Sequence, residues 1–78
     1  MEKEFEPIIR KIISMAQMGR NGDDIMKTSL EEVSVALRQP AVMRLLPDSD
    51  EIRKKAQELD EKDFDRWWWE AVYKGNIA

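Results

Sequence analysis

The chain has 78 residues and a formal net charge of −3, from 13 Lys+Arg against 16 Asp+Glu, and it contains no Cys and no His. This length predicts a single domain over residues 1–78, since domains have roughly 50–250 residues, and the composition excludes zinc fingers, disulfides, thiol nucleophiles and imidazole bases. No apolar run approaches the ~20 residues of a membrane span, and the charged N-terminus lacks a signal-peptide pattern. We therefore expect a cytoplasmic protein without a membrane span.

The first predicted helix covers about residues 3–18. Its apolar residues recur at i, i+3, i+4, i+7 and i+11, which is the spacing of one helical face. These residues are Phe5, Ile8, Ile9, Ile12 and Ala16. The polar stretch 19–24 contains two glycines and predicts the loop that follows.

The second predicted helix begins near Ser29, where Ser29 and Glu32 have the spacing of an N-terminal capping box. Pro40 ends this helix, because the residue before a proline is pushed out of the α region. A short extra helical turn is predicted over residues 40–46, and Pro47 stops it.

The third predicted helix starts at Asp48, with Glu51 three residues later, and the fourth follows Asp63. One face of the fourth helix carries Phe64, Trp67, Trp68, Ala71 and Val72. Because no strand-like alternation extends beyond three or four residues, the sequence predicts an all-α fold of four helices. The helices form two helix–loop–helix halves, roughly residues 3–46 and 48–78.

Residues 21–32 form a twelve-residue segment between two predicted helices, and we compared this segment with a calcium-binding loop. Four residues occupy ligand positions and are the weak metal candidates: Asn21, Asp23, Ser29 and Glu32. Ile25 and Met26 stand where such a loop needs an oxygen ligand and a glycine. The favoured interpretation is a polar interhelical loop without a metal, and we expect no cofactor, calcium being the one considered.

The second half repeats this plan, with a helix over 47–60 and an aromatic helix over 62–72. Together with the capping pattern near Ser29, the chain resembles a single degenerate lobe of the EF-hand superfamily, which includes calmodulin-like proteins and myosin light chains. Only three residues separate Asp60 from Phe64, where the family pattern has six. The resemblance implies paired hands with calcium binding weak or lost, and a groove that accepts an amphipathic helix.

Three consecutive tryptophans at residues 67–69 cannot all face one way, since a helix turns about 100° per residue. Large aromatic and Met side chains suit adaptable binding surfaces, although they also fill small cores. The predicted groove residues are Ile12, Met15, Leu37, Met43, Trp68 and Val72. Trp69 and Tyr73 are a predicted second surface.

The sequence therefore predicts a non-catalytic protein-interaction module, similar to a light chain, that binds an amphipathic partner helix without calcium. The alternatives are a small regulatory inhibitor of viral or plasmid-borne type and a homo-oligomeric structural subunit. A calcium sensor and a DNA-binding protein are less favoured, because a helix–turn–helix over residues 29–46 would have too short a turn and Arg44 as the only cation of its second helix. We expect no nucleic-acid partner. Catalysis is not expected, since the acidic pairs lie where helix starts favour acids.

Overall fold

The computed structural model describes residues 6–74. Within this range the elements are α1 (Glu6–Gln17), α2 (Gly22–Leu37), the 3-10 turn η2 (Met43–Leu45), α3 (Ser49–Glu58), α4 (Glu61–Trp68) and the π-helical turn η3 (Trp69–Tyr73). The prediction of an all-helical fold with four helices is confirmed for this part of the chain. No helix in residues 6–74 has the length and apolar character needed to cross a membrane.

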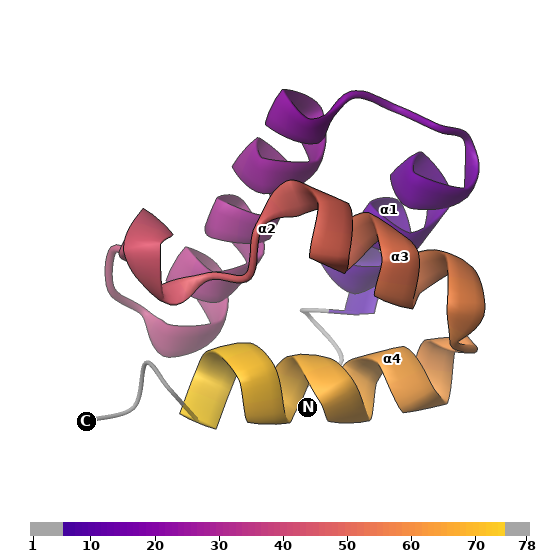
Figure 1. Cartoon of the computed structure of the whole chain (residues 1–78). Helices are drawn as coiled ribbons and strands as arrows, with labels where there is room; N and C mark the ends of the chain where they lie inside the picture. Colours follow the sequence, from indigo (N-terminus) through magenta and orange to yellow (C-terminus); the bar gives the residue numbers. More distant parts are fainter. Residues whose placement is uncertain (1–5, 75–78) are drawn as a thin grey trace.

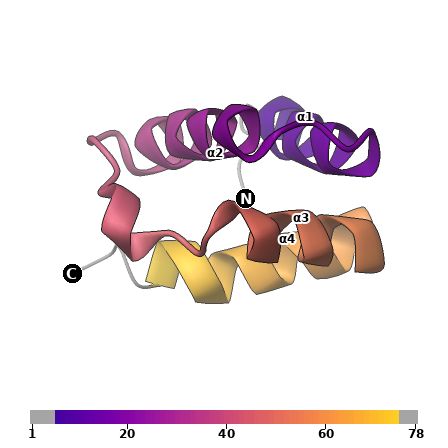
Figure 2. The same ribbon diagram turned by 45° about the horizontal axis from the view of Figure 1, so that its top comes forward.

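The helices form two layers (Figures 1 and 2). Figure 2 shows α1 and α2 in one layer and α3 and α4 in the other. The chain leaves the first layer at the end of α2, passes through η2, and returns through α3 and α4, with η3 continuing the last helix (Figure 1). The EF-hand-pair arrangement stays a prediction.

The core lies between the two layers. It is built from side chains of every α-helix, of η3 and of the residue after η2: Ile9, Ile12, Ala16, Ile25, Val33, Leu46, Ile52, Ala56, Phe64, Trp68, Val72 and Tyr73. The predicted faces of the first and fourth helices are confirmed where they are described, although Phe5 lies outside the described residues. Ile9, Ile12 and Ala16 are buried, as periodicity predicts for a helix with one apolar face.

Three helices begin at a side chain that caps a free backbone N–H. The Asn21 side chain accepts a hydrogen bond from the Asp24 N–H at 2.9 Å. In the same way Asp48 accepts from the Glu51 N–H at 2.9 Å, and Asp60 accepts from the Asp63 N–H at 2.8 Å. Such caps satisfy donors that have no partner inside the helix. The predicted start at Asp48 is confirmed, whereas α4 starts at Asp60 rather than Asp63.

The predicted start of the second helix near Ser29 is wrong, because α2 begins at Gly22. The Asn21 cap and two acidic residues in the first turn favour this earlier start. Ser29 does not cap a helix; its hydroxyl donates to the Ile25 carbonyl at 2.7 Å within α2. The loop before α2 is accordingly shorter than the predicted 19–24.

The α1–α2 connection is held by a left-handed glycine and by α3. Gly19 has φ +73°, and the Arg20 N–H bonds the Met15 carbonyl at 3.0 Å, which closes the end of α1. From α3, the Arg53 guanidinium donates to the Arg20 carbonyl at 3.2 Å, and the Gln57 amide donates to the Ala16 carbonyl at 2.8 Å. These contacts fix the first layer on the second.

The end of α2 has a left-handed residue that is not glycine. Arg38 has φ 55°, and the Gln39 N–H bonds the Ser34 carbonyl at 3.1 Å. The helix therefore ends just before Pro40, as predicted. The predicted turn over 40–46 is a 3-10 turn limited to Met43–Leu45.

Candidate functional site

A buried carboxylate joins the two layers. Glu32 of α2 is fully buried, and its Oε2 accepts a hydrogen bond from Nε1 of Trp68 at 2.8 Å. The Tyr73 hydroxyl donates to the other oxygen, Oε1. Burial raises the pKa of Glu32 from 4.5 to about 7; the Trp68 hydrogen bond opposes this rise, and the negative charge of Asp65 adds to it.

The π-helical turn explains how two residues of one helix reach the same carboxylate. In an α-helix, residues five apart point about 140° away from each other, because the helix turns about 100° per residue. In η3 the Lys74 N–H bonds the Trp69 carbonyl, five residues back, so the turn is wider. The wider turn brings Tyr73 onto the face that carries Trp68, and their rings meet edge to face at 6.5 Å.

The four metal candidates are not brought together. Asn21 caps α2, and Asp23 is exposed in the first turn of that helix. The Ser29 hydroxyl donates to the Ile25 carbonyl. Glu32 is buried and accepts hydrogen bonds from Trp68 and Tyr73. Residues 22–32 are helix, so the favoured interpretation of residues 21–32 as a polar interhelical loop is wrong. No group of three or more acidic, His or Cys residues within the described range could hold a metal ion.

The predicted partner-binding residues do not line one open groove. Half of them lie in the closed core: Ile12, Trp68, Val72 and Tyr73. Met15 and Leu37 are half-buried, and Met43 and Trp69 are exposed. Trp69 is exposed, whereas the predicted second surface formed with Tyr73 is wrong, because the π-helical turn moves Tyr73 to the inside.

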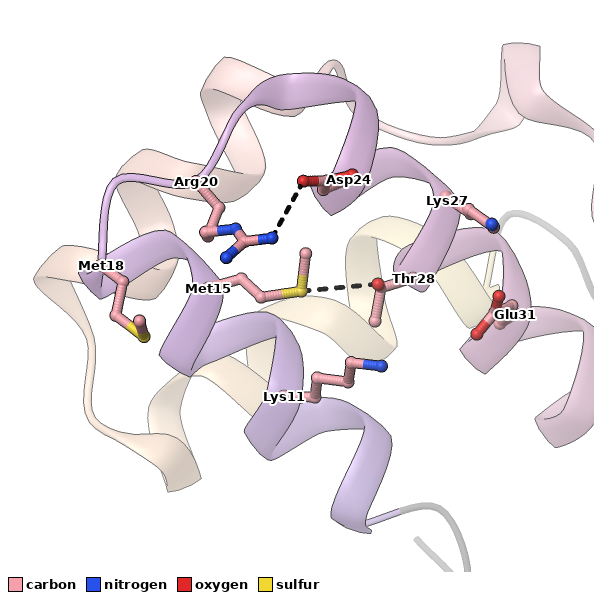
Figure 3. A pocket seen from close by; sticks show the side chains of 8 residues that line it. All are labelled: Lys11, Met15, Met18, Arg20, Asp24, Lys27, Thr28 and Glu31. Atoms are coloured by element: carbon pink, nitrogen blue, oxygen red, sulfur yellow. Dashed lines mark hydrogen bonds and ion pairs between the residues drawn. The ribbon is translucent and has the colours of Figure 1, made fainter.

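A pocket of about 360 Å³ lies between α1 and α2 (Figure 3). Its lining residues are Lys11, Met15, Met18, Arg20, Asp24, Lys27, Thr28 and Glu31. Figure 3 shows the Arg20–Asp24 ion pair at 3.5 Å and the Thr28 hydroxyl donating to the Met15 sulfur at 3.5 Å. Because cations and acids alternate around the pocket and it is open to solvent, it does not select one ligand charge.

Four exposed apolar residues belong to the C-terminal end of α2 and to the segment around η2. We call this region the apolar corner; it consists of Val35, Val42, Met43 and Leu45, which are between 40% and 59% exposed. Figures 1 and 2 show η2 beside the C-terminal end of α2. The chain just before η2 is held against α2 by a hydrogen bond, in which the Ala41 N–H donates to the Ser34 hydroxyl at 3.2 Å.

Sequence reasoning selected only Met43 from this corner. The signal that could have found the rest is the apolar run at 41–46, which lies between two prolines. So short a segment cannot turn all its side chains inward, and only Leu46 is buried there. η3 reaches the same end of the molecule (Figure 1), and it carries the exposed Trp69.

Comparisons with protein-family models, with curated proteins and with solved structures found no match to this chain. The resemblance to an EF-hand lobe therefore stays a prediction. The function has to be argued from the geometry of this molecule.

Proposed function

We propose that the protein is a non-catalytic interaction module that binds an amphipathic helix of a partner protein at the apolar corner, without calcium. The observation that carries this proposal is the exposure of Val35, Val42, Met43 and Leu45 at one end of a molecule whose core is otherwise closed. Clustered apolar side chains on a surface are typical of protein-binding sites. An amphipathic helix covers such a cluster with residues spaced at i, i+3, i+4 and i+7.

The binding surface differs from the groove that the sequence predicted. Ile12, Trp68 and Val72 already serve the core, so exposing them would require the two layers to separate. The corner needs no such opening. Binding there leaves the Glu32 contacts with Trp68 and Tyr73 intact.

The apolar area sets a scale for the affinity. Complete burial of a large apolar side chain contributes about 1.5–3 kcal/mol, and the four corner residues are about half exposed. Covering them contributes about 3–6 kcal/mol in total, which is close to the free energy of a millimolar complex, about 4 kcal/mol. A partner that binds more tightly must also contact polar or charged groups around the corner.

The test uses a phage-displayed library of helix-forming peptides selected on the immobilised full chain. The library fixes leucines at i, i+3, i+4 and i+7 and randomises the other positions among Asp, Glu, Lys, Arg and Ser. Selected peptides are then measured against Met43→Asp and against the matched control Met18→Asp. Met18 is 71% exposed, follows α1, and so lies away from the corner.

The proposal predicts that Met43→Asp weakens the selected peptides at least about tenfold, whereas Met18→Asp changes their affinity less than about twofold. Both side chains are mostly exposed, so both variants should keep the helical circular dichroism of the wild type. Failure to select any binder, or equal losses in the two variants, would contradict the proposal.

A further inference from the structure

We infer that the helix bound at the apolar corner is acidic, with carboxylates on the flanks of its apolar face; this inference rests on the proposed function. The observation is the distribution of charge along the chain. Residues 33–47, which contain the whole corner, include two arginines and no Asp or Glu, although the chain as a whole has a net charge of −3. The corner is a local basic region on an acidic protein.

Both arginines of this region are exposed and available. Arg38 and Arg44 form no ion pair or side-chain hydrogen bond within residues 6–74. By contrast, Arg10, Arg20 and Arg53 are each paired with a carboxylate of this chain. The guanidinium groups of Arg38 and Arg44 can therefore donate hydrogen bonds to carboxylates of a partner without breaking an existing pair.

The two cations are close in sequence to the apolar residues of the corner. Arg44 lies between Met43 and Leu45 in η2. Arg38 follows Val35 by three residues at the end of α2, where its backbone N–H bonds the Val35 carbonyl at 3.2 Å. A helix with an apolar stripe and flanking acids matches this alternation of apolar and basic groups.

Neighbouring charges do not cancel the basic character of the corner. η3, which ends near η2 in Figure 1, contributes one acid, Glu70, and Lys74 follows it as one base. The nearest exposed acid on α2 is Glu31, which lines the pocket between α1 and α2. Within residues 33–47, two arginines and no acid leave a positive charge for a partner.

A second copy of the chain fits the corner less well than a different protein does. Helix α3, which carries three acids and three bases, has its apolar residues Ile52 and Ala56 fully buried in its own core. The apolar residues Phe64 and Trp68 of α4 are buried in the same way. These helices could offer only their polar faces to another copy.

The library selection described above also tests this inference. We expect Asp and Glu to outnumber Lys and Arg among the randomised positions of the selected peptides by at least about threefold. The double variant Arg38→Gln/Arg44→Gln should weaken a selected acidic peptide about fivefold to tenfold, with less effect at 0.5 M salt. The charge-matched control Lys54→Gln/Lys62→Gln, at two exposed lysines of α3 and α4, should change the affinity less than about twofold.

The outcomes separate this inference from the proposed function. Peptides that lose affinity with Met43→Asp but carry balanced or basic flanks would overturn the acidic partner and retain the interaction module. Sedimentation of the full chain as a dimer that Met43→Asp dissociates would overturn the inference in favour of a second copy. Equal effects of the arginine pair and the lysine pair would also overturn it.

Discussion

The indole N–H of Trp68 donates a hydrogen bond to the carboxylate of Glu32 at 2.8 Å, across 36 positions of sequence and in a fully buried environment. Together with the Tyr73 hydroxyl, it gives the carboxylate two neutral donors. Glu32 forms no ion pair with any cation of residues 6–74. Burial without a nearby cation favours the protonated form of an acid. The stability that the Glu32 contacts give to the packing of the two layers should therefore depend on pH.

The folded protein should lose stability as the pH rises from about 4.5 to about 7. Below pH 4.5 Glu32 is protonated in both states; above it, the unfolded chain releases the proton while the folded protein, with the pKa of Glu32 raised to about 7, still holds it. The free energy of unfolding contributed by this group therefore falls by roughly 3 kcal/mol over this window. Urea unfolding at a series of pH values measures the fall.

The matched variant is Glu32→Gln, which keeps an acceptor for Trp68 and cannot ionise. We expect it to be more stable than the wild type by roughly 2–3 kcal/mol at pH 8 and to differ by less than about 1 kcal/mol at pH 4.5. Comparing the two proteins removes the contributions of the other acids. A stability difference that is the same at both pH values would show that Glu32 does not titrate in this window.

Tyr73→Phe should destabilise the protein by about 1–3 kcal/mol at pH 8, because it removes a donor from a buried carboxylate. The ring contacts with Trp68 and Trp69 remain. In the Glu32→Gln background, Tyr73→Phe should lower the free energy of unfolding by less, because the side chain at position 32 then carries no charge. Equal costs in the two backgrounds would mean that the hydroxyl does not act through Glu32.

Arg38→Gly should stabilise the protein by about 1 kcal/mol. Arg38 adopts φ 55°, a left-handed conformation that disfavours residues with a Cβ and that glycine adopts readily at helix ends. The control Arg38→Ala removes the charge and keeps the Cβ, so it should give no such gain. Thermal unfolding of the three proteins distinguishes conformational strain from an effect of the charge.

Gly22→Ala should destabilise the protein, although alanine is the better helix former by about 1 kcal/mol. A Cβ at this position would lie 2.5 Å from the Ser49 hydroxyl oxygen, at the point where the start of α2 meets the start of α3. We expect a loss of about 1–2 kcal/mol. Adding Ser49→Ala removes the oxygen and should recover part of the loss; a stabilised single variant would refute this close contact.

Calcium should leave the tryptophan emission unchanged up to millimolar concentration. Ser29 and Glu32 are buried in α2, and Asn21 already caps it, so these oxygens cannot converge on one ion without unfolding the helix. Magnesium at the same concentration is the control for ionic strength. A saturable change with calcium alone would contradict the helix over residues 22–32.

Local patterns predicted much of the fold. The spacing of Ile9, Ile12 and Ala16 identified a buried face, and Asp48 identified a helix start, because both signals lie within a few turns of one helix. One prediction failed for a non-local reason. The position of Tyr73 depends on a π-helical turn and on its hydrogen bond to Glu32 of another helix, whereas periodicity assumes a regular α-helix.

The second helix shows a different failure, in which one local signal was chosen over another. Ser29 and Glu32 have capping spacing, but Asn21 with Asp23 and Asp24 makes an equally good start one segment earlier. The helix begins at the earlier of the two signals, so Ile25 lies within α2 and is buried in the core. Sequence patterns selected Met43 and Trp69 as partner-binding residues, and both are exposed, but the patterns did not select Val35, which is exposed as well.

The most direct test of the central claim is a map of backbone amide shifts on the ¹⁵N-labelled full chain as a library-selected peptide is added. The account predicts that the largest shifts fall at residues 35–38 and 42–45, with the indole N–H of Trp68 unchanged because the core stays closed. Shifts concentrated at the pocket between α1 and α2, or a large change at the Trp68 indole, would contradict it.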